Sequence, residues 1–271
     1  MKRIKMNMML ENTENTKIKD CTLIHGDCFD VMPLIEDKSV DVIIADLPYG
    51  TTACRWDTVL PFDKLWKQYE RIIKDNGAIV LFGSEPFSSK LRMSNIENFK
   101  YDWVWEKNRG SNFALVKYQP MKEHEMISVF SYNTHKYYPI KEQRKGSGLE
   151  RINGNYNTGK ASNTTGIKQT ICKTQGQELR QPSSIQKYNT TEKGVKRIHP
   201  TQKPVALIEY LIKTYTNEGD MVLDNVMGSA TTGVACLKTD RKFIGIEKDK
   251  EYYDIAVDRL AESEYKTERI I

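Results

Sequence analysis

Cysteine is scarce in this sequence: the 271 residues include five, at positions 21, 28, 54, 172 and 236. They are odd in number and form no CxxC pair, which argues against structural zinc and a disulfide framework and favours a reducing, cytoplasmic compartment. No stretch approaches the roughly 20 apolar residues that span a bilayer, so we expect no membrane segment. The first six residues are basic, but no long apolar run or small-residue cleavage site follows them, so they do not resemble a signal peptide.

The net charge of +5 conceals an uneven distribution. Residues 133–197 hold 13 Lys and Arg but four Asp and Glu, a local charge of +9, which leaves −4 for the rest of the chain. The same segment is rich in Asn, Thr, Gly, Gln and Ser and has no sustained helical or strand period. Composition alone leaves two interpretations open: a disordered basic linker, or a surface that docks on a polyanion.

Outside that segment, apolar strands alternate with amphipathic helices. This alternation predicts an α/β fold with a mostly parallel sheet and helices on both faces, and ligands bind at the carboxyl ends of the strands in such sheets. Asn76 and Gly77 are interpreted as the stop of the first long helix. We expect strands at 22–25, 40–45, 78–82, 101–105, 126–130, 221–224 and 243–246, and helices at 62–73, 86–96, 205–215, 231–238 and 252–260.

Two loops at predicted strand ends carry chemistry. In the loop 224–233, Gly228 and Gly233 permit close backbone approach, and Glu247 ends the next strand, where it can accept hydrogen bonds from a ribose diol. This pattern suits a nucleoside cofactor, but it also suits a dinucleotide oxidoreductase or an ordinary strand–helix turn. In the loop 46–49 (DLPY), the Asp46 carboxylate and a neighbouring carbonyl can receive an exocyclic amine while Tyr49 stacks on the attached ring; a plain turn is the alternative.

The order of these motifs resembles the β class of S-adenosylmethionine-dependent DNA amino-methyltransferases. The matching stretches are DLPYGTT at 46–52 with Trp56, GAIVLFG at 77–83, YDWVWEK at 101–107, HPTQKP at 199–204, DNVMGS at 224–229 and FIGIE at 243–247. The resemblance implies a Rossmann-like methyltransferase fold with circularly permuted motif order. It also implies a discontinuous catalytic and cofactor domain, 1–132 with 198–271, around a partly flexible target-recognition insert at 133–197.

The resemblance further implies roles for individual residues. The catalytic set would be Asp46, Leu47, Pro48 and Tyr49, which hold the target amine and stack on a base flipped out of the duplex. The residues implied to bind S-adenosyl-L-methionine are Asp27, Cys28, Asp46, His199, Thr201, Gln202, Lys203, Asp224, Val226, Gly228, Ser229 and Glu247. Among them, Lys203 would meet the cofactor carboxylate. The implied DNA contacts are Lys107, Arg109, Lys141, Arg144, Lys145, Arg151, Lys196 and Arg197, and no metal is expected.

Two positions depart from the family pattern. Leu47 stands where the family usually has a proline, but the carbonyl of residue 47 survives the change. Ala230 stands where a second glycine is frequent; its methyl group should fit if the backbone there is helical, whereas cofactor affinity would suffer if that backbone needs a positive φ.

We expect N6 of adenine in double-stranded DNA as the target. The alternatives are N4 of cytosine, whose enzymes more often carry Ser at the position of Asp46, a nucleotide-dependent oxidoreductase, and a non-enzymatic DNA-binding protein. A homodimer and a cognate restriction endonuclease are possible partners.

Overall fold

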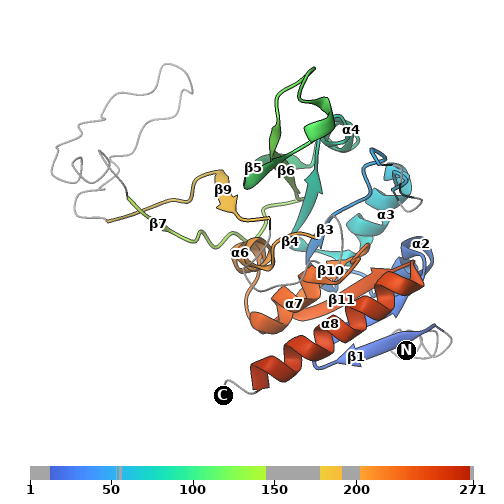
Figure 1. Ribbon diagram of the computed structural model, residues 1–271. Coiled ribbons are helices and arrows are strands. Elements are labelled where there is room, and N and C mark those ends of the chain that lie inside the picture. The colour runs from blue at the N-terminus through green and yellow to red at the C-terminus, as the bar shows by residue number, and fades with distance from the viewer. Residues whose placement is uncertain (1–12, 53, 55–56, 145–177, 191–201, 269–271) are drawn as a thin grey trace. The chain divides into compact units, whose positions relative to one another are not determined.

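Figure 1 shows the computed structural model of the protein, which describes residues 13–52, 54, 57–144, 178–190 and 202–268. The chain forms two compact units, Met1–Tyr138 with Ser184–Ile271, and Pro139–Ser183. In the smaller unit, β7 (Glu142–Gln143) pairs antiparallel with β8 (Leu179–Arg180). This unit is shorter than the predicted insert at 133–197, because residues on both sides of it belong to the larger unit.

The larger unit is built on a nine-stranded mixed sheet. Its order is β1-β2-β11-β10-β3-β4-β6-β5-β9, with β2, β11, β10, β3 and β4 parallel to one another. β6 runs antiparallel to β4 and to β5, and β1 antiparallel to β2. The strands are β1 (Asn15–Ile18), β2 (Cys21–His25), β3 (Val40–Ala45), β4 (Ile73–Gly83), β5 (Phe99–Ser111), β6 (Lys122–Phe130), β9 (Ile185–Tyr188), β10 (Met221–Asp224) and β11 (Lys242–Glu247).

Helices cover both faces of this sheet, as the sequence predicts (Figure 1). Alternate residues along β3 pack to opposite sides: Val42 and Ile44 belong to one core cluster, and Ile43 and Ala45 to the other. Because both faces of β3 are covered, all six of its residues are buried, including Asp41, which pairs with Lys74 and Lys136. One face carries α2 (Cys28–Val31), α3 (Phe62–Ile72) and α4 (Phe87–Met93), and the other carries α6 (Val205–Tyr215), α7 (Thr231–Lys238) and α8 (Lys250–Glu268).

Most predicted elements lie where expected, but the helix stop at Asn76 and Gly77 is wrong. Helix α3 ends at Ile72, and the chain enters β4 at Ile73, opposite Val40 of β3. Gly77 is required for another reason: a Cβ there would lie 2.8 Å from the Asp41 carbonyl oxygen and 2.6 Å from the Ile73 side chain. The glycine therefore permits close packing inside the sheet.

The topology brings distant segments of sequence together at one edge. β10 lies between β11 and β3, so Asp224 at the end of β10 neighbours the loop that follows β3, where Asp46 lies. Glu247 ends β11, the strand on the other side. In the described part of the chain, we find no helix long and apolar enough to cross a membrane.

Candidate active site

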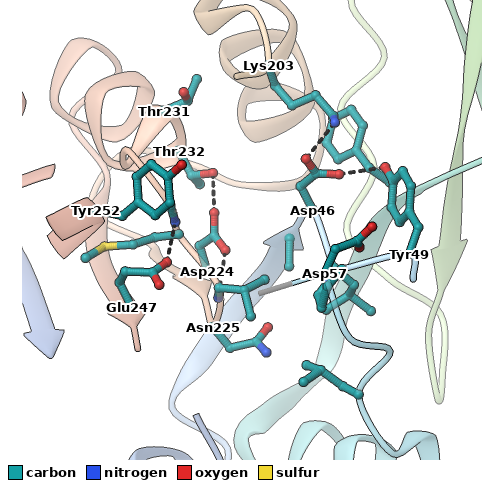
Figure 2. Close-up of a pocket in the computed structure, with 18 of the residues that line it drawn as sticks. Asp46, Tyr49, Asp57, Lys203, Asp224, Asn225, Thr231, Thr232, Glu247 and Tyr252 are labelled. Carbon is teal, nitrogen blue, oxygen red and sulfur yellow. Dashed lines mark hydrogen bonds and ion pairs between the residues drawn. The ribbon is translucent and has the colours of Figure 1, made fainter. Parts of the chain in front are cut away.

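A cavity of about 1120 Å³ lies along the carboxyl ends of these strands. The loops after β2, β3, β10 and β11 line it, and Lys107 of β5 and Glu125 of β6 close one side. Figure 2 shows two groups of side chains inside it: one around Asp46 and one around Asp224. A cavity of this size accommodates a nucleoside cofactor and part of a second ligand.

The loop 46–49 holds a carboxylate and an aromatic ring at the cavity wall. The Tyr49 hydroxyl donates to Asp46 Oδ1 at 2.6 Å, and the Tyr49 ring stacks on Phe87 with centroids 4.9 Å apart. Leu47 is 2% exposed and packs into the core beside β3. The buried side chain fixes the loop 46–49 against the core, so this leucine has a structural role where the family usually has a proline.

Asp57 organises the chain that follows Tyr49. Its carboxylate accepts hydrogen bonds from the backbone N–H groups of Gly50, Thr51 and Thr52 at 2.7–2.9 Å. Burial would raise the pKa of Asp57, but a hydrogen bond from the Thr52 side chain together with these backbone hydrogen bonds lowers it below its usual value. Sequence reasoning missed this residue, because an acid seven positions after a glycine is not a distinctive pattern; the contacts depend on the turn at Gly50, whose φ is +68°.

A chain of alternating charges connects Asp46 to the far wall. Lys203 Nζ lies 2.6 Å from Asp46 Oδ2 and 3.2 Å from Glu125 Oε2, and Lys107 Nζ lies 2.5 Å from Glu125 Oε1. Burial raises the pKa of Asp46, although Lys203 opposes the shift. Burial would lower the pKa of Lys203, but the two carboxylates that face it raise this pKa, so the amine stays protonated.

The second group surrounds Asp224. Thr232 Oγ1 donates to Asp224 Oδ2 at 2.7 Å, and the Val226 N–H donates to Oδ1 at 3.2 Å. Burial raises the pKa of Asp224 to about 7, against the effect of these two hydrogen bonds. Glu247, whose pKa burial also raises, accepts from the N–H groups of Gly228 at 2.9 Å and Asp249 at 2.8 Å.

The structure gives the backbone conformation of Ala230 in the loop 224–233, which we call the cofactor loop. Ala230 has φ 53° and ψ 44°, in the left-handed region, and immediately precedes helix α7. Gly228 also has a positive φ, of 51°. The alanine is thus held in a conformation that favours glycine, at a cost of about 1–2 kcal/mol.

The structure brings most of the predicted cofactor residues to this cavity. Asp27, Cys28, Gln202, Val226, Gly228 and Ser229 line it together with Asp46, Lys203, Asp224 and Glu247. Asp27 also accepts from the Phe29 N–H at the start of α2 and pairs with Lys248 at 3.0 Å. Lys203, which the resemblance implies would meet the cofactor carboxylate, contacts the carboxylates of Asp46 and Glu125 in this structure. His199 and Thr201 lie outside the described residues.

The predicted DNA contacts are distributed differently. The Lys107 side chain is 9% exposed and belongs to the cavity wall, where it pairs with Glu125. Arg109 is exposed on the same strand. Lys141 and Arg144 belong to the smaller unit, while Lys145, Arg151, Lys196 and Arg197 lie outside the described residues.

Comparison with known proteins identifies the class. Residues 40–258 match the model of the N6/N4 methyltransferase family, described as DNA methylase. This match covers most of the chain, so the protein belongs to this family of DNA methyltransferases. The resemblance to β-class amino-methyltransferases and the expected Rossmann-like fold are both confirmed.

Individual relatives agree with this assignment. The chain is 29% identical over 269 residues to type II methyltransferase M2.LlaDCHI of Lactococcus lactis subsp. cremoris, covering 89% of this chain and 90% of the relative. It is also 29% identical to type II methyltransferase M2.DpnII of Streptococcus pneumoniae, with the same coverage. The crystal structure of the M1.HpyAVI-SAM complex superposes with a TM-score of 0.60 at 28% identity, covering 89% of this chain and all of that one.

The residues of the cavity fit S-adenosyl-L-methionine, the expected cofactor, which is confirmed at the level of the family. A carboxylate offers about four acceptor positions, and the contacts above occupy two on Asp224 and two on Glu247. The acceptor positions that remain on Glu247 would suit the ribose hydroxyls of this cofactor, and those on Asp224 would suit the ammonium group of its methionine part. When bound, this cofactor supplies an electrophilic methyl group on a sulfonium.

Proposed function

We propose that the protein methylates the N6 amino group of adenine at a specific site in double-stranded DNA, after the target base has left the duplex. The observation that carries this proposal is the Asp46 carboxylate, held by Tyr49 and Lys203 in the wall of the cavity that also contains Asp224. An aspartate at this position favours adenine, because N4-cytosine enzymes more often carry serine there.

The chain's own residues supply three functions. Asp46 and the carbonyl of residue 47 accept hydrogen bonds from the two amine protons, which localises the nitrogen lone pair and favours the pyramidal nitrogen of the transition state. The Tyr49 ring, already stacked on Phe87, offers a face to the base. As the nitrogen forms its bond to the methyl carbon, the bond from that carbon to the cofactor sulfur breaks; the nitrogen then releases a proton, which Asp46 can accept and pass to water. No covalent enzyme intermediate is needed.

Labelling with methyl-labelled S-adenosylmethionine tests the target. Unmethylated DNA is incubated with the protein, digested to nucleosides and analysed by mass spectrometry. We expect label on N6-methyladenine. Label on N4-methylcytosine would replace the adenine assignment, and absence of label from all DNA would favour a non-enzymatic DNA-binding role. Single-molecule sequencing of DNA from expressing cells would then report the methylated site.

A partner endonuclease also remains a proposal. The two relatives above are named type II methyltransferases, which supports a place in a restriction–modification pair. A homodimer is a second expectation from the resemblance, and sedimentation of the purified protein tests it directly. The predicted reading of DNA sequence by residues 133–197 likewise stays a prediction.

A further inference from the structure

The hairpin between β5 and β6 ends in an apolar surface. We call residues 112–121 the hairpin tip. Figure 1 shows this green hairpin reaching beyond the rest of the sheet. The exposed fractions of its large apolar residues are 67% for Phe113, 45% for Leu115, 50% for Val116, 85% for Tyr118 and 44% for Met121. A contiguous exposed set of this kind marks an interaction surface.

The backbone of the tip is ordered although its side chains are exposed. Asn112 adopts φ 76° and begins a 3₁₀ turn at Phe113–Leu115. The Leu115 N–H donates to the Asn112 carbonyl at 3.0 Å, and the Tyr118 N–H donates to the Leu115 carbonyl at 2.9 Å. The turn therefore presents its apolar side chains outward from a hydrogen-bonded frame, which reduces the entropy lost on binding.

The charge around the tip identifies the kind of partner. Residues 107–122 include Lys107, Arg109, Lys117 and Lys122 and no Asp or Glu. Lys107 is paired with Glu125 in the cavity wall, whereas Arg109 and Lys117 are exposed beside the apolar residues. Exposed aromatic rings between cationic side chains suit a nucleic acid, which offers both base faces and phosphates.

The position of the hairpin connects this surface to the reaction. Ser111, at the base of the tip, lines the same cavity as Asp46 and Tyr49. A base that enters the cavity leaves an unstacked gap in the duplex, and the cost of that gap opposes flipping. An aromatic side chain at the rim can stack in the gap and recover part of this cost.

We propose that the hairpin tip inserts Phe113 or Tyr118 into the space that the flipped base vacates, while Arg109 and Lys117 contact the neighbouring phosphates. The inference rests on the proposed function and assigns positioning residues to it. Stacking of one base on an aromatic residue changes affinity by roughly 5- to 150-fold. A loss in that range is expected when both rings are removed.

The test compares two duplexes that carry the methylation site found by sequencing. In one duplex the target base faces its normal partner, and in the other it faces an abasic position, where flipping costs less. The variant is F113A/Y118A, and the matched control is Tyr265→Ala, which removes a 56% exposed tyrosine on α8. Single-turnover methylation is measured on both duplexes, with thermal unfolding and sedimentation of each protein.

We expect the double variant to lose roughly 5- to 150-fold in rate on the normal duplex and to stay within about threefold of wild type on the abasic duplex. The control should match wild type on both. An equal loss on the two duplexes, no loss on either, or an oligomeric state that differs from that of the wild type would overturn the inference. If the wild type methylated neither duplex nor any other DNA, the proposed function would fail and the inference with it.

Discussion

Lys203 Nζ lies 2.6 Å from Asp46 Oδ2, so the carboxylate expected to receive the target amine already holds an ammonium group. The two residues are 157 positions apart in the sequence. Lys203 is shared with Glu125, which lies 3.2 Å away. The charge environment of Asp46 therefore depends on a lysine that is shared with a second carboxylate.

Replacing Lys203 should destabilise the fold. K203Q leaves Asp46 without a cation and Glu125 with Lys107 alone, and breaking a buried pair in this way costs about 3–5 kcal/mol. The free energy of unfolding is measured by denaturant titration. In K203Q/D46N no carboxylate is left without its cation and Glu125 keeps its pair with Lys107, so we expect part of the loss to be recovered. A double variant no more stable than K203Q would contradict this account.

Replacing Asp46 should separate catalysis from cofactor binding. Asp46→Asn removes the negative charge but keeps the size of the side chain, so we expect methyl transfer to fall by about 10²–10³-fold, as for loss of one preorganised transition-state contact. Calorimetry should find cofactor affinity within a few-fold of wild type. Asp63→Asn makes the same chemical change at an exposed position of α3 and should be silent. Near-normal turnover by Asp46→Asn would exclude the assigned role.

Asp224 should make the stability of the free enzyme depend on pH. Burial raises its pKa to about 7, above the value of 3.8 for an unperturbed aspartate, so the folded state binds the proton more tightly than the unfolded state. Protonated Asp224 therefore stabilises the folded state at low pH. This contribution to the free energy of unfolding, on the order of 4 kcal/mol at most, is lost as the pH rises from about 4 to 7. Asp224→Asn can keep both hydrogen bonds, accepting from Val226 and donating to Thr232, and should abolish this slope.

The same ionisation should govern cofactor affinity. A bound cation favours ionised Asp224, so the dissociation constant for S-adenosylmethionine should rise as pH falls below about 7, approaching tenfold per pH unit. Calorimetry between pH 5.5 and 8.5 measures this. Asp224→Asn should bind weakly at every pH, with no such trend. An affinity independent of pH in the wild type would show that Asp224 does not meet the charge.

Asp57 should affect turnover through the loop that it organises. Asp57→Asn keeps one acceptor oxygen but weakens the contacts to the N–H groups of Gly50, Thr51 and Thr52, at a cost of about 1–3 kcal/mol. Because Tyr49 immediately precedes this loop, we expect a lower kcat with an unchanged dissociation constant for the cofactor. A variant with wild-type kcat would show that the loop does not position Tyr49.

Ala230→Gly changes the cofactor loop, and its separate effects on the free energy of unfolding oppose one another. Relief of the left-handed conformation favours the glycine by about 1–2 kcal/mol, while loss of a buried methyl group costs about 0.8 kcal/mol. The greater freedom of glycine in the unfolded chain costs a further 0.4–1 kcal/mol or so. We therefore expect unfolding free energies within about 1 kcal/mol of each other. A loss above about 2 kcal/mol in denaturant titration would contradict the balance.

The sequence predicts those parts of the fold that depend on local pattern. Apolar runs such as Val40–Ala45 predict buried strands, and the helices at 205–215 and 231–238 lie at the predicted positions. β1 and β9 were not predicted, because their short, polar sequences NTKI and IQKY become strands through pairing with β2 and β5.

The candidate site likewise has features that the sequence predicts and features that it does not. Loops at strand ends can be predicted because parallel strands share one edge. The contact of Lys203 with Asp46 and Glu125 depends on side-chain packing across three separate segments, and no spacing in the sequence encodes it. The conformation of Ala230 is likewise set by the turn into α7, which would ordinarily select glycine.

The order of the central strands has a consequence for synthesis of the chain. β2 and β3 are successive in sequence, yet β11 and β10 lie between them in the sheet. A nascent chain therefore exposes the edges of β2 and β3 until Met221–Asp224 and Lys242–Glu247 leave the ribosome and fill the gap. The sheet closes last at its centre, which is where the cofactor loop meets the catalytic loop. Arrested chains that end before Met221 should accordingly stay sensitive to protease, and full-length chains should become resistant.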